Sequence, residues 1–129
     1  MNSEINSIIN EFTCSGLIFK SPRPEHRMRI ERNALKKLSV RNDYLSEYNM
    51  ALRYVFLFFL EHGYDIQDNM VHSVFKTYCI RVLNFRATMI TDIIRLRHNL
   101  KYTACDVNSF VKKDLKDVLT SLASKNIKK

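Results

Sequence analysis

The densest group of chemically capable side chains in this 129-residue chain lies in one short segment, Arg95–Tyr102. Its eight residues include two arginines, a histidine, an amide and a phenol. Arginine holds phosphate oxygens through paired hydrogen bonds and stays charged. An imidazole or a phenol can move a proton at a reacting oxygen. The segment therefore has groups that could hold an RNA phosphate and cleave it without a metal ion.

Helical spacing decides which of these side chains can act together. On a helix, Arg95, Asn99 and Tyr102 share one face, because they are four and three residues apart. His98 borders that face, whereas Arg97 joins it only if the helix ends or bends. The other interpretation is a helix end whose cations favour the negative end of the helix dipole, with Tyr102 packed inward.

The positive charge of the chain is confined to its second half. Residues 1–75 carry nine Lys/Arg and nine Asp/Glu, whereas residues 76–129 carry twelve Lys/Arg and four Asp/Glu, which leaves the net charge of +8 there. A basic half predicts an anionic partner, such as RNA or a nucleotide, although a lysine-rich soluble surface has the same composition. The candidate nucleic-acid-binding residues are Arg95, Lys101, Lys112, Lys113 and Lys116.

Other kinds of site have little support in the sequence. No histidine has another histidine or a cysteine three or four residues away, and no Cys-x-x-Cys occurs, so we expect no metal. The two glycines are solitary and form no phosphate loop, so we expect no cofactor. Cys14, Cys79 and Cys105 are too few and too far apart for a disulfide framework, and Cys79 is expected in the core.

The same features predict a cytoplasmic protein. The first residues are polar and acidic and do not resemble a signal peptide. The longest apolar run, Val55–Leu60, is too short to cross a bilayer, so we expect no membrane partner.

The elements that must position these side chains are helices. Two glycines and two prolines are too few for the many tight turns of an all-β domain. Apolar periodicity predicts helices over 2–12, 25–40 and 43–62. It also predicts a helix that begins at Asp68, another through 89–100, and a last one that begins at Asp106. The fold prediction is all-α, an antiparallel four- to five-helix up-and-down bundle at 25–129, preceded by an N-terminal extension, 1–24, of a short helix and a loop.

Several local features refine this prediction. Asn42 or Asp43 is expected to cap the 43–62 helix, and Gly63 to stop it. Phe56 and Phe59 of that helix are expected in the core or in a dimer interface. Two surface assignments complete the prediction. The arginines and lysines of the 25–40 helix, Arg27 included, are expected to face solvent, and Phe110 is expected on the apolar face of the last helix.

Four blocks follow one another along the chain: Ala51-Leu52, Leu60-Glu61-His62-Gly63, His72-Ser73-Val74-Phe75 and Arg97-His98-Asn99-Leu100-Lys101-Tyr102. Their order and spacing resemble the HEPN domains of prokaryotes, over roughly residues 30–123. The resemblance implies a helical bundle that is usually a dimer. Many members of that family are metal-independent ribonucleases, often toxins paired with a nucleotidyltransferase antitoxin or acting in phage defence.

The resemblance also implies roles for individual residues. Arg97 matches the arginine of the family's active-site motif, and Tyr102 stands where the motif has a histidine. His98 adjoins the arginine instead, and Asn99 lies in the polar stretch between. The implied catalytic residues are thus Arg97, His98, Asn99 and Tyr102. Three functions follow as alternatives: an endoribonuclease, a non-catalytic module that binds RNA, a nucleotide or a partner protein, or a purely structural dimerisation domain. His72 matches a histidine common in the family's third helix and is expected to pack or cap.

Overall fold

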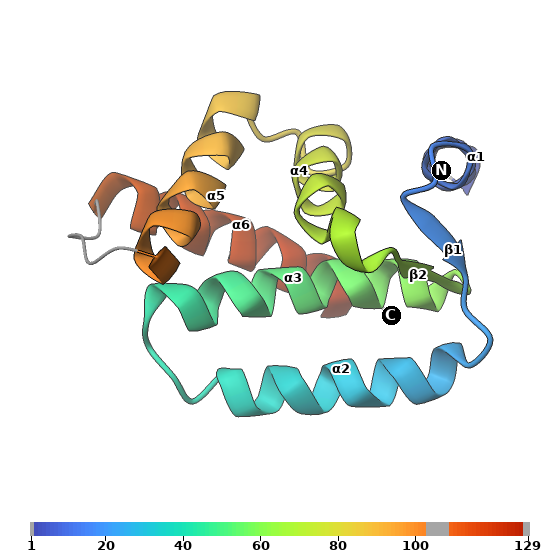
Figure 1. The fold of residues 1–129 in the computed structure, drawn as a ribbon, viewed down its shortest axis with the longest axis horizontal. Helices are drawn as coiled ribbons and strands as arrows, with labels where there is room; N and C mark the ends of the chain where they lie inside the picture. The colour runs from blue at the N-terminus through green and yellow to red at the C-terminus, as the bar shows by residue number, and fades with distance from the viewer. Residues whose placement is uncertain (1, 103–108, 128–129) are drawn as a thin grey trace.

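The computed structural model describes residues 2–102 and 109–127 of the chain (Figure 1). Those residues form six α-helices, a short 3-10 helix and one two-stranded sheet, so the all-α prediction is confirmed. One of the six, α1, corresponds to the short helix predicted for the N-terminal segment, and the other five follow it along the chain. In chain order the elements are α1 (Asn2–Cys14), β1 (Ile18–Lys20), α2 (Pro24–Leu38), α3 (Tyr44–Glu61), β2 (Tyr64–Ile66), η1 (Asp68–Met70), α4 (Val71–Arg81), α5 (Ala87–Tyr102) and α6 (Ser109–Ile127).

The central element is α3, as its wide apolar face predicts. Figure 1 shows α2 alongside it on one side, while α4 and α5 rise from it on the other side with α6 behind them. Tyr48, Val55 and Phe59 are at most 1% exposed, and Phe56 is 8% exposed, which confirms both phenylalanines in the core. Each fully buried side chain of this kind contributes about 1.5–3 kcal/mol. The helix starts where predicted, because the Asp43 carboxylate accepts a hydrogen bond from the Ser46 N–H at 2.9 Å.

The N-terminal segment predicted as an extension contributes to the same core. Ile8, Ile9 and Phe12 of α1 are buried, and the Phe12 ring stacks on Phe59 with 5.5 Å between centroids. β1 then pairs antiparallel with β2, with Ile18 opposite Ile66. Neither strand is predicted from the sequence, because a run of three residues is too short to establish a two-residue period.

Gly63 ends α3, as predicted, and turns the chain into β2. Its φ is +89°, a left-handed backbone angle that glycine adopts without a steric penalty. Because β2 follows directly, the turn brings the chain back toward β1 and joins the N-terminal segment to the end of α3.

The prediction that the basic face of the second helix is solvated is wrong for Arg27. Its guanidinium forms ion pairs with Asp65 at 2.8 Å and with Glu31 at 3.0 Å, and it lies over the Phe56 ring. Glu31 also pairs with Arg53 of α3 at 3.2 Å. Buried carboxylates need such partners, and here two of them are buried where α2 meets α3 and β2.

The last two helices complete the core. α5 contributes Ile90 and Ile93, which are fully buried, and α6 packs on both α3 and α5. The prediction for Phe110 is wrong: this side chain is 79% exposed, because it lies one helical step away from the inward positions of α6. Asp106 lies outside the described residues, as does Cys105. No helix in the described ranges is both long and apolar enough to cross a membrane.

Candidate functional site

The helix α5 stays regular through the Arg95–Tyr102 segment, so its side chains spread around the helix. Arg95 and Asn99 share a face, as their spacing predicts, and both line a hollow of about 290 Å³ beside α6. Arg97 lies on another side, with its guanidinium carbon 5.8 Å from the centre of the Tyr48 ring. The structure therefore places Arg97 and Asn99 in different surroundings.

The remaining residues of the segment are distributed as follows. His98 and Asn99 are exposed on α5. The side chains of Lys101 and Tyr102 are not among those described, so their expected roles in phosphate binding and proton transfer stay predictions.

The predicted basic residues of α6 have separate surroundings. Lys116 donates to the buried carboxylate of Glu47 at 2.7 Å and so joins α6 to α3. Lys113 pairs with Asp117 one turn further along at 3.1 Å. Lys112 is exposed. Because an ion pair neutralises part of a lysine's charge, Lys116 and Lys113 offer less to an anionic ligand than Lys112 does.

A buried phenol organises the space between α3, α4 and α5. The Tyr48 hydroxyl lies 2.8 Å from Nδ1 of His72, and the two rings stack with 5.7 Å between centroids. Burial raises the pKa of Tyr48 above its usual range, while the charge of Arg97 acts in the opposite direction and is the smaller effect. Tyr48 therefore keeps its proton at neutral pH.

This hydrogen bond determines which atom His72 presents to a ligand. A protonated phenol buried in the core has to donate its hydrogen, and Nδ1 of His72 lies within reach. A neutral imidazole that accepts at Nδ1 carries its own proton on Nε2. With that tautomer, the Nε2–H of the half-buried His72 is a donor, and the hydrogen bond to Tyr48 orients its ring.

His72 forms part of the wall of a hollow between α4 and α5, which we call the α4–α5 groove. Its volume is about 300 Å³. Among the described residues that line it, the charged groups are Lys76 and Arg95, and none is a carboxylate. Arg95 also makes a long contact of 3.4 Å with Asp92, in which both side chains are more than half exposed, so its charge is only weakly offset. The lining consists of His72, Ser73, Lys76, Thr91, Ile94 and Arg95.

Such a lining suits an anion. Two cations, an imidazole N–H and two hydroxyl groups all donate hydrogen bonds, which phosphate oxygens accept. No acidic side chain in the lining repels the ligand. The groove can therefore bind a phosphate group, and the Tyr48 ring, with Arg97 above it, supports the histidine from behind.

The sequence predicts only part of this groove. Arg95 was predicted, whereas His72 was expected to pack or cap. Lys76 and the phenol of Tyr48 were missed as functional groups. A signal was present for Tyr48, because a phenol on an otherwise apolar helix face needs a polar partner in the core. Only the fold identifies that partner, 24 residues away.

In the part of the chain that the structure describes, no three His, Cys, Asp or Glu side chains gather as a metal site. Comparison with known proteins adds no identity: no family model, curated protein or solved structure matches this chain.

Proposed function

We propose that this chain binds RNA and that the α4–α5 groove holds one of its phosphates. Lys76 and Arg95 neutralise the phosphate charge, and the Nε2–H of His72 donates to one of its oxygens. The hydroxyls of Ser73 and Thr91 supply further donors. The observation that carries this proposal is the lining of the groove, which has two cations and no carboxylate among the described residues.

RNA fits the charge distribution better than a mononucleotide does. The basic excess extends along residues 76–129 and beyond the groove itself. A polyanion can contact several cations at once and release the counterions condensed on each phosphate. Lys112, exposed on α6, is a candidate for such an outer contact.

A second candidate function is metal-independent cleavage of the bound RNA. The observation that favours it is that the Arg97 guanidinium lies over the Tyr48 ring while the imidazole of His72 contacts the hydroxyl of the same phenol. In this reaction the ribose 2′-oxygen attacks the phosphorus and the 5′-oxygen leaves, which gives a 2′,3′-cyclic phosphate. One group takes the 2′-hydroxyl proton and another protonates the leaving oxygen.

The His72 tautomer favours binding over cleavage in this comparison. A neutral ring with its proton on Nε2 donates a hydrogen bond but does not accept the 2′-hydroxyl proton. The base in the second candidate would therefore be His98, the exposed histidine of α5. Under this second candidate the chain acts as a HEPN-like ribonuclease in a toxin–antitoxin or phage-defence system, with a nucleotidyltransferase as its protein partner.

One experiment tests both functions. Fluorescence anisotropy with a labelled single-stranded RNA, measured across a salt series, should show affinity falling by roughly 0.7 log units per phosphate contact for each tenfold rise in salt. Lys76→Met should reduce both the affinity and this slope, because one contact is lost. The same RNA, incubated with EDTA and run on a gel, reports cleavage directly, and Arg97→Ala should abolish any cleavage that occurs.

The matched control is Lys37→Met, which removes an exposed lysine from α2 in the charge-balanced half of the chain. It should leave the affinity and the salt slope unchanged. RNA affinity that ignores salt, or that falls equally in both variants, contradicts the groove as the binding site.

A further inference from the structure

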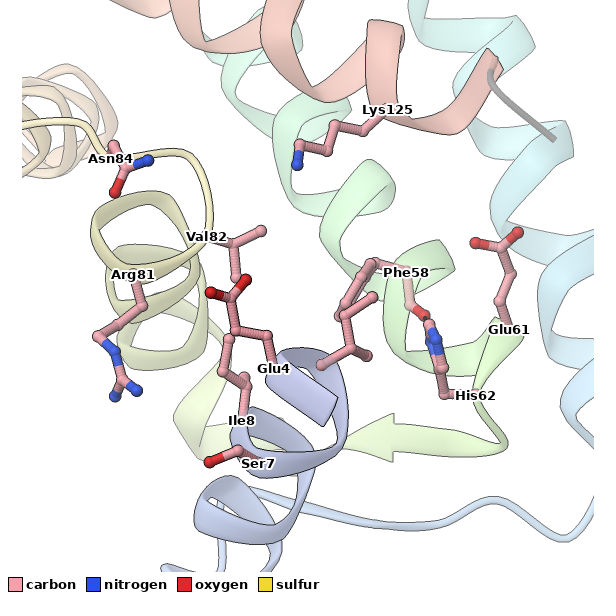
Figure 2. A pocket seen from close by; sticks show the side chains of 11 residues that line it. Glu4, Ser7, Ile8, Phe58, Glu61, His62, Arg81, Val82, Asn84 and Lys125 are labelled. Carbon is pink, nitrogen blue, oxygen red and sulfur yellow. Dashed lines mark hydrogen bonds between the residues drawn. The ribbon is translucent and has the colours of Figure 1, made fainter. Parts of the chain in front are cut away.

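A hollow larger than the α4–α5 groove lies away from it, and the two share no lining residue among those described. Its volume is about 750 Å³, within the range of small-molecule sites. We call it the α1 cavity, because α1 forms one wall and the C-terminal ends of α3, α4 and α6 form the others. Figure 2 shows these walls converging, with Glu4 of α1, Phe58 of α3 and Lys125 of α6 around the central space.

Part of the wall is apolar and aromatic. The Phe58 ring is half-buried and meets the Tyr78 ring, with 4.8 Å between centroids. Ile8 and Val82 lie beside it in the lining. This part of the wall suits a flat apolar group, because aromatic rings gain from offset or edge contacts with a further ring.

Charged groups of both signs border that apolar wall. Figure 2 shows the Glu4 carboxylate and the Lys125 ammonium directed into the same space from α1 and α6. Neither forms an ion pair with any other described residue. The third charge nearby, Arg81, is already held by two hydrogen bonds of 2.8 and 2.9 Å to Glu11. The cavity thus presents the Glu4 carboxylate and the Lys125 ammonium to a ligand, and the Glu61 carboxylate also lies in its lining.

His62 adds an acceptor to this wall. Its Nδ1 lies 2.9 Å from the carbonyl oxygen of Phe58, which can only accept, so Nδ1 carries the proton. In the neutral ring Nε2 is then an acceptor. A ligand ammonium near Glu4 can therefore find a second hydrogen-bond acceptor in the same lining.

We propose that the α1 cavity binds a free aromatic α-amino acid. The side-chain ring packs on Phe58, the ammonium pairs with Glu4, and the carboxylate pairs with Lys125. An amino acid within a peptide lacks one or both of these charges, so the cavity selects the free zwitterion. A nucleotide is the wrong ligand here, because Glu4 and Glu61 both line the cavity and repel a polyanion.

The test is to measure the binding of L-phenylalanine to the full chain by isothermal titration calorimetry or by saturation-transfer NMR. The expected dissociation constant is about 1 mM, a typical value for a ligand of this size held by a few contacts. N-acetyl-phenylalanine, which lacks the ammonium, and phenylalanine amide, which lacks the carboxylate, should each bind at least tenfold more weakly. L-alanine, which lacks the ring, should show no binding.

Two variants test the proposed contacts. Lys125→Met and Glu4→Gln should each weaken L-phenylalanine binding at least tenfold, while the matched controls Lys37→Met and Glu25→Gln, both at exposed positions of α2, leave it unchanged. The ligand series on the unmodified chain keeps the test valid if a variant fails to fold. The proposal is overturned if L-phenylalanine does not bind at about 10 mM, tenfold above the expected dissociation constant. It is also overturned if the amide and acetyl derivatives bind as tightly as L-phenylalanine does.

Discussion

At the scale of single residues, the phenol of Tyr48 connects the core to the proposed site. It is fully buried on α3, yet its hydroxyl sets the orientation and the tautomer of His72 on the wall of the α4–α5 groove. Tyr44, one turn earlier, uses its hydroxyl differently, donating to the Ile93 carbonyl at 2.9 Å and so tying α3 to α5. On α3, the Tyr44 phenol thus has a structural role, and the Tyr48 phenol orients a side chain of the proposed site.

Tyr48→Phe should separate these roles. The loss of one hydrogen bond should lower the free energy of unfolding by about 1 kcal/mol, because the ring still fills its space. Without the donor, Nδ1 of His72 is no longer held as an acceptor, so its ¹⁵N signals should shift from the Nε2–H tautomer toward a mixture. RNA affinity should fall, because the Nε2–H of His72 is then no longer held as a donor to the phosphate.

The matched variant is Tyr44→Phe. It removes a buried hydrogen bond of similar length, so it should cost a similar free energy of unfolding. It should leave the His72 signals and RNA binding unchanged. Identical His72 spectra in both variants would contradict the proposed tautomer control.

At the scale of elements, α2 depends on charge as much as on apolar contact. Its strongly polar sequence packs on α3, and the ion pairs of Arg27 and Arg53 with Glu31 and Asp65 lie at that junction. The Asp65 hydrogen bond is the main reason that the pKa of Arg27 is raised. Buried carboxylates left without these partners would destabilise the junction.

Arg27→Met should therefore lower the free energy of unfolding by about 3 kcal/mol, because it leaves Asp65 without its guanidinium and Glu31 with only Arg53. Urea denaturation measures the loss, and hydrogen exchange should show faster opening of α2 than of α3. Arg29→Met, at an exposed position of the same helix, should change stability by less than about 0.5 kcal/mol. Equal effects of the two substitutions would mean that the ion pairs do not stabilise the junction.

At the scale of the whole molecule, the core holds several weakly acidic groups in their neutral form. Burial raises the pKa of the Cys79 thiol to about 12, and burial also raises the pKa values of Tyr44, Tyr48 and Tyr78. Each group loses its proton at a lower pH in the unfolded chain than in the folded one. Each group therefore contributes to the free energy of unfolding only at pH values where its proton stays bound.

Stability should fall as pH rises above about 9, where Cys79 begins to ionise in the unfolded chain but not in the folded one. The contribution of this thiol should be fully lost by about pH 12. Each such group adds up to about 1.4 kcal/mol per pH unit to the slope with which the free energy of unfolding falls. Thermal melts between pH 7 and 11 measure it. Cys79→Ala should flatten the decline between pH 9 and 10, and a melting temperature that stays constant to pH 11 would contradict this account.

Assembly is a second property at this scale, and we predict a homodimer. The prediction rests on the HEPN resemblance, in which two copies of the Arg97–Tyr102 segment meet across one cleft. Light scattering at micromolar concentration should give twice the 15.3 kDa mass of the chain. A monomeric mass would contradict the dimer while leaving the α4–α5 groove, which one chain forms alone, as the RNA site.

The sequence by itself determined the helices and the main core positions. Apolar periodicity, few glycines, the Asp43 cap and the Gly63 stop are local signals, and each was confirmed. The positions of the charged residues also located the basic half of the chain. Helical spacing predicted that Arg95 and Asn99 share one face of α5. The two short strands were beyond the reach of the sequence, because three residues do not establish a two-residue period. The prediction for Phe110 was wrong although its place beside the inward positions of α6 follows from helical spacing.

Only the tertiary structure decided which distant groups meet. The pair of Tyr48 with His72, the ion pair of Arg27 with Asp65, and the convergence of Glu4 with Lys125 on one cavity each join residues more than 20 positions apart. Helical spacing carries no information about such pairs, because they depend on how α1, α3, α4 and α6 pack against one another. The physical reason is that a buried polar group must find its partner wherever the packing brings one within hydrogen-bond distance.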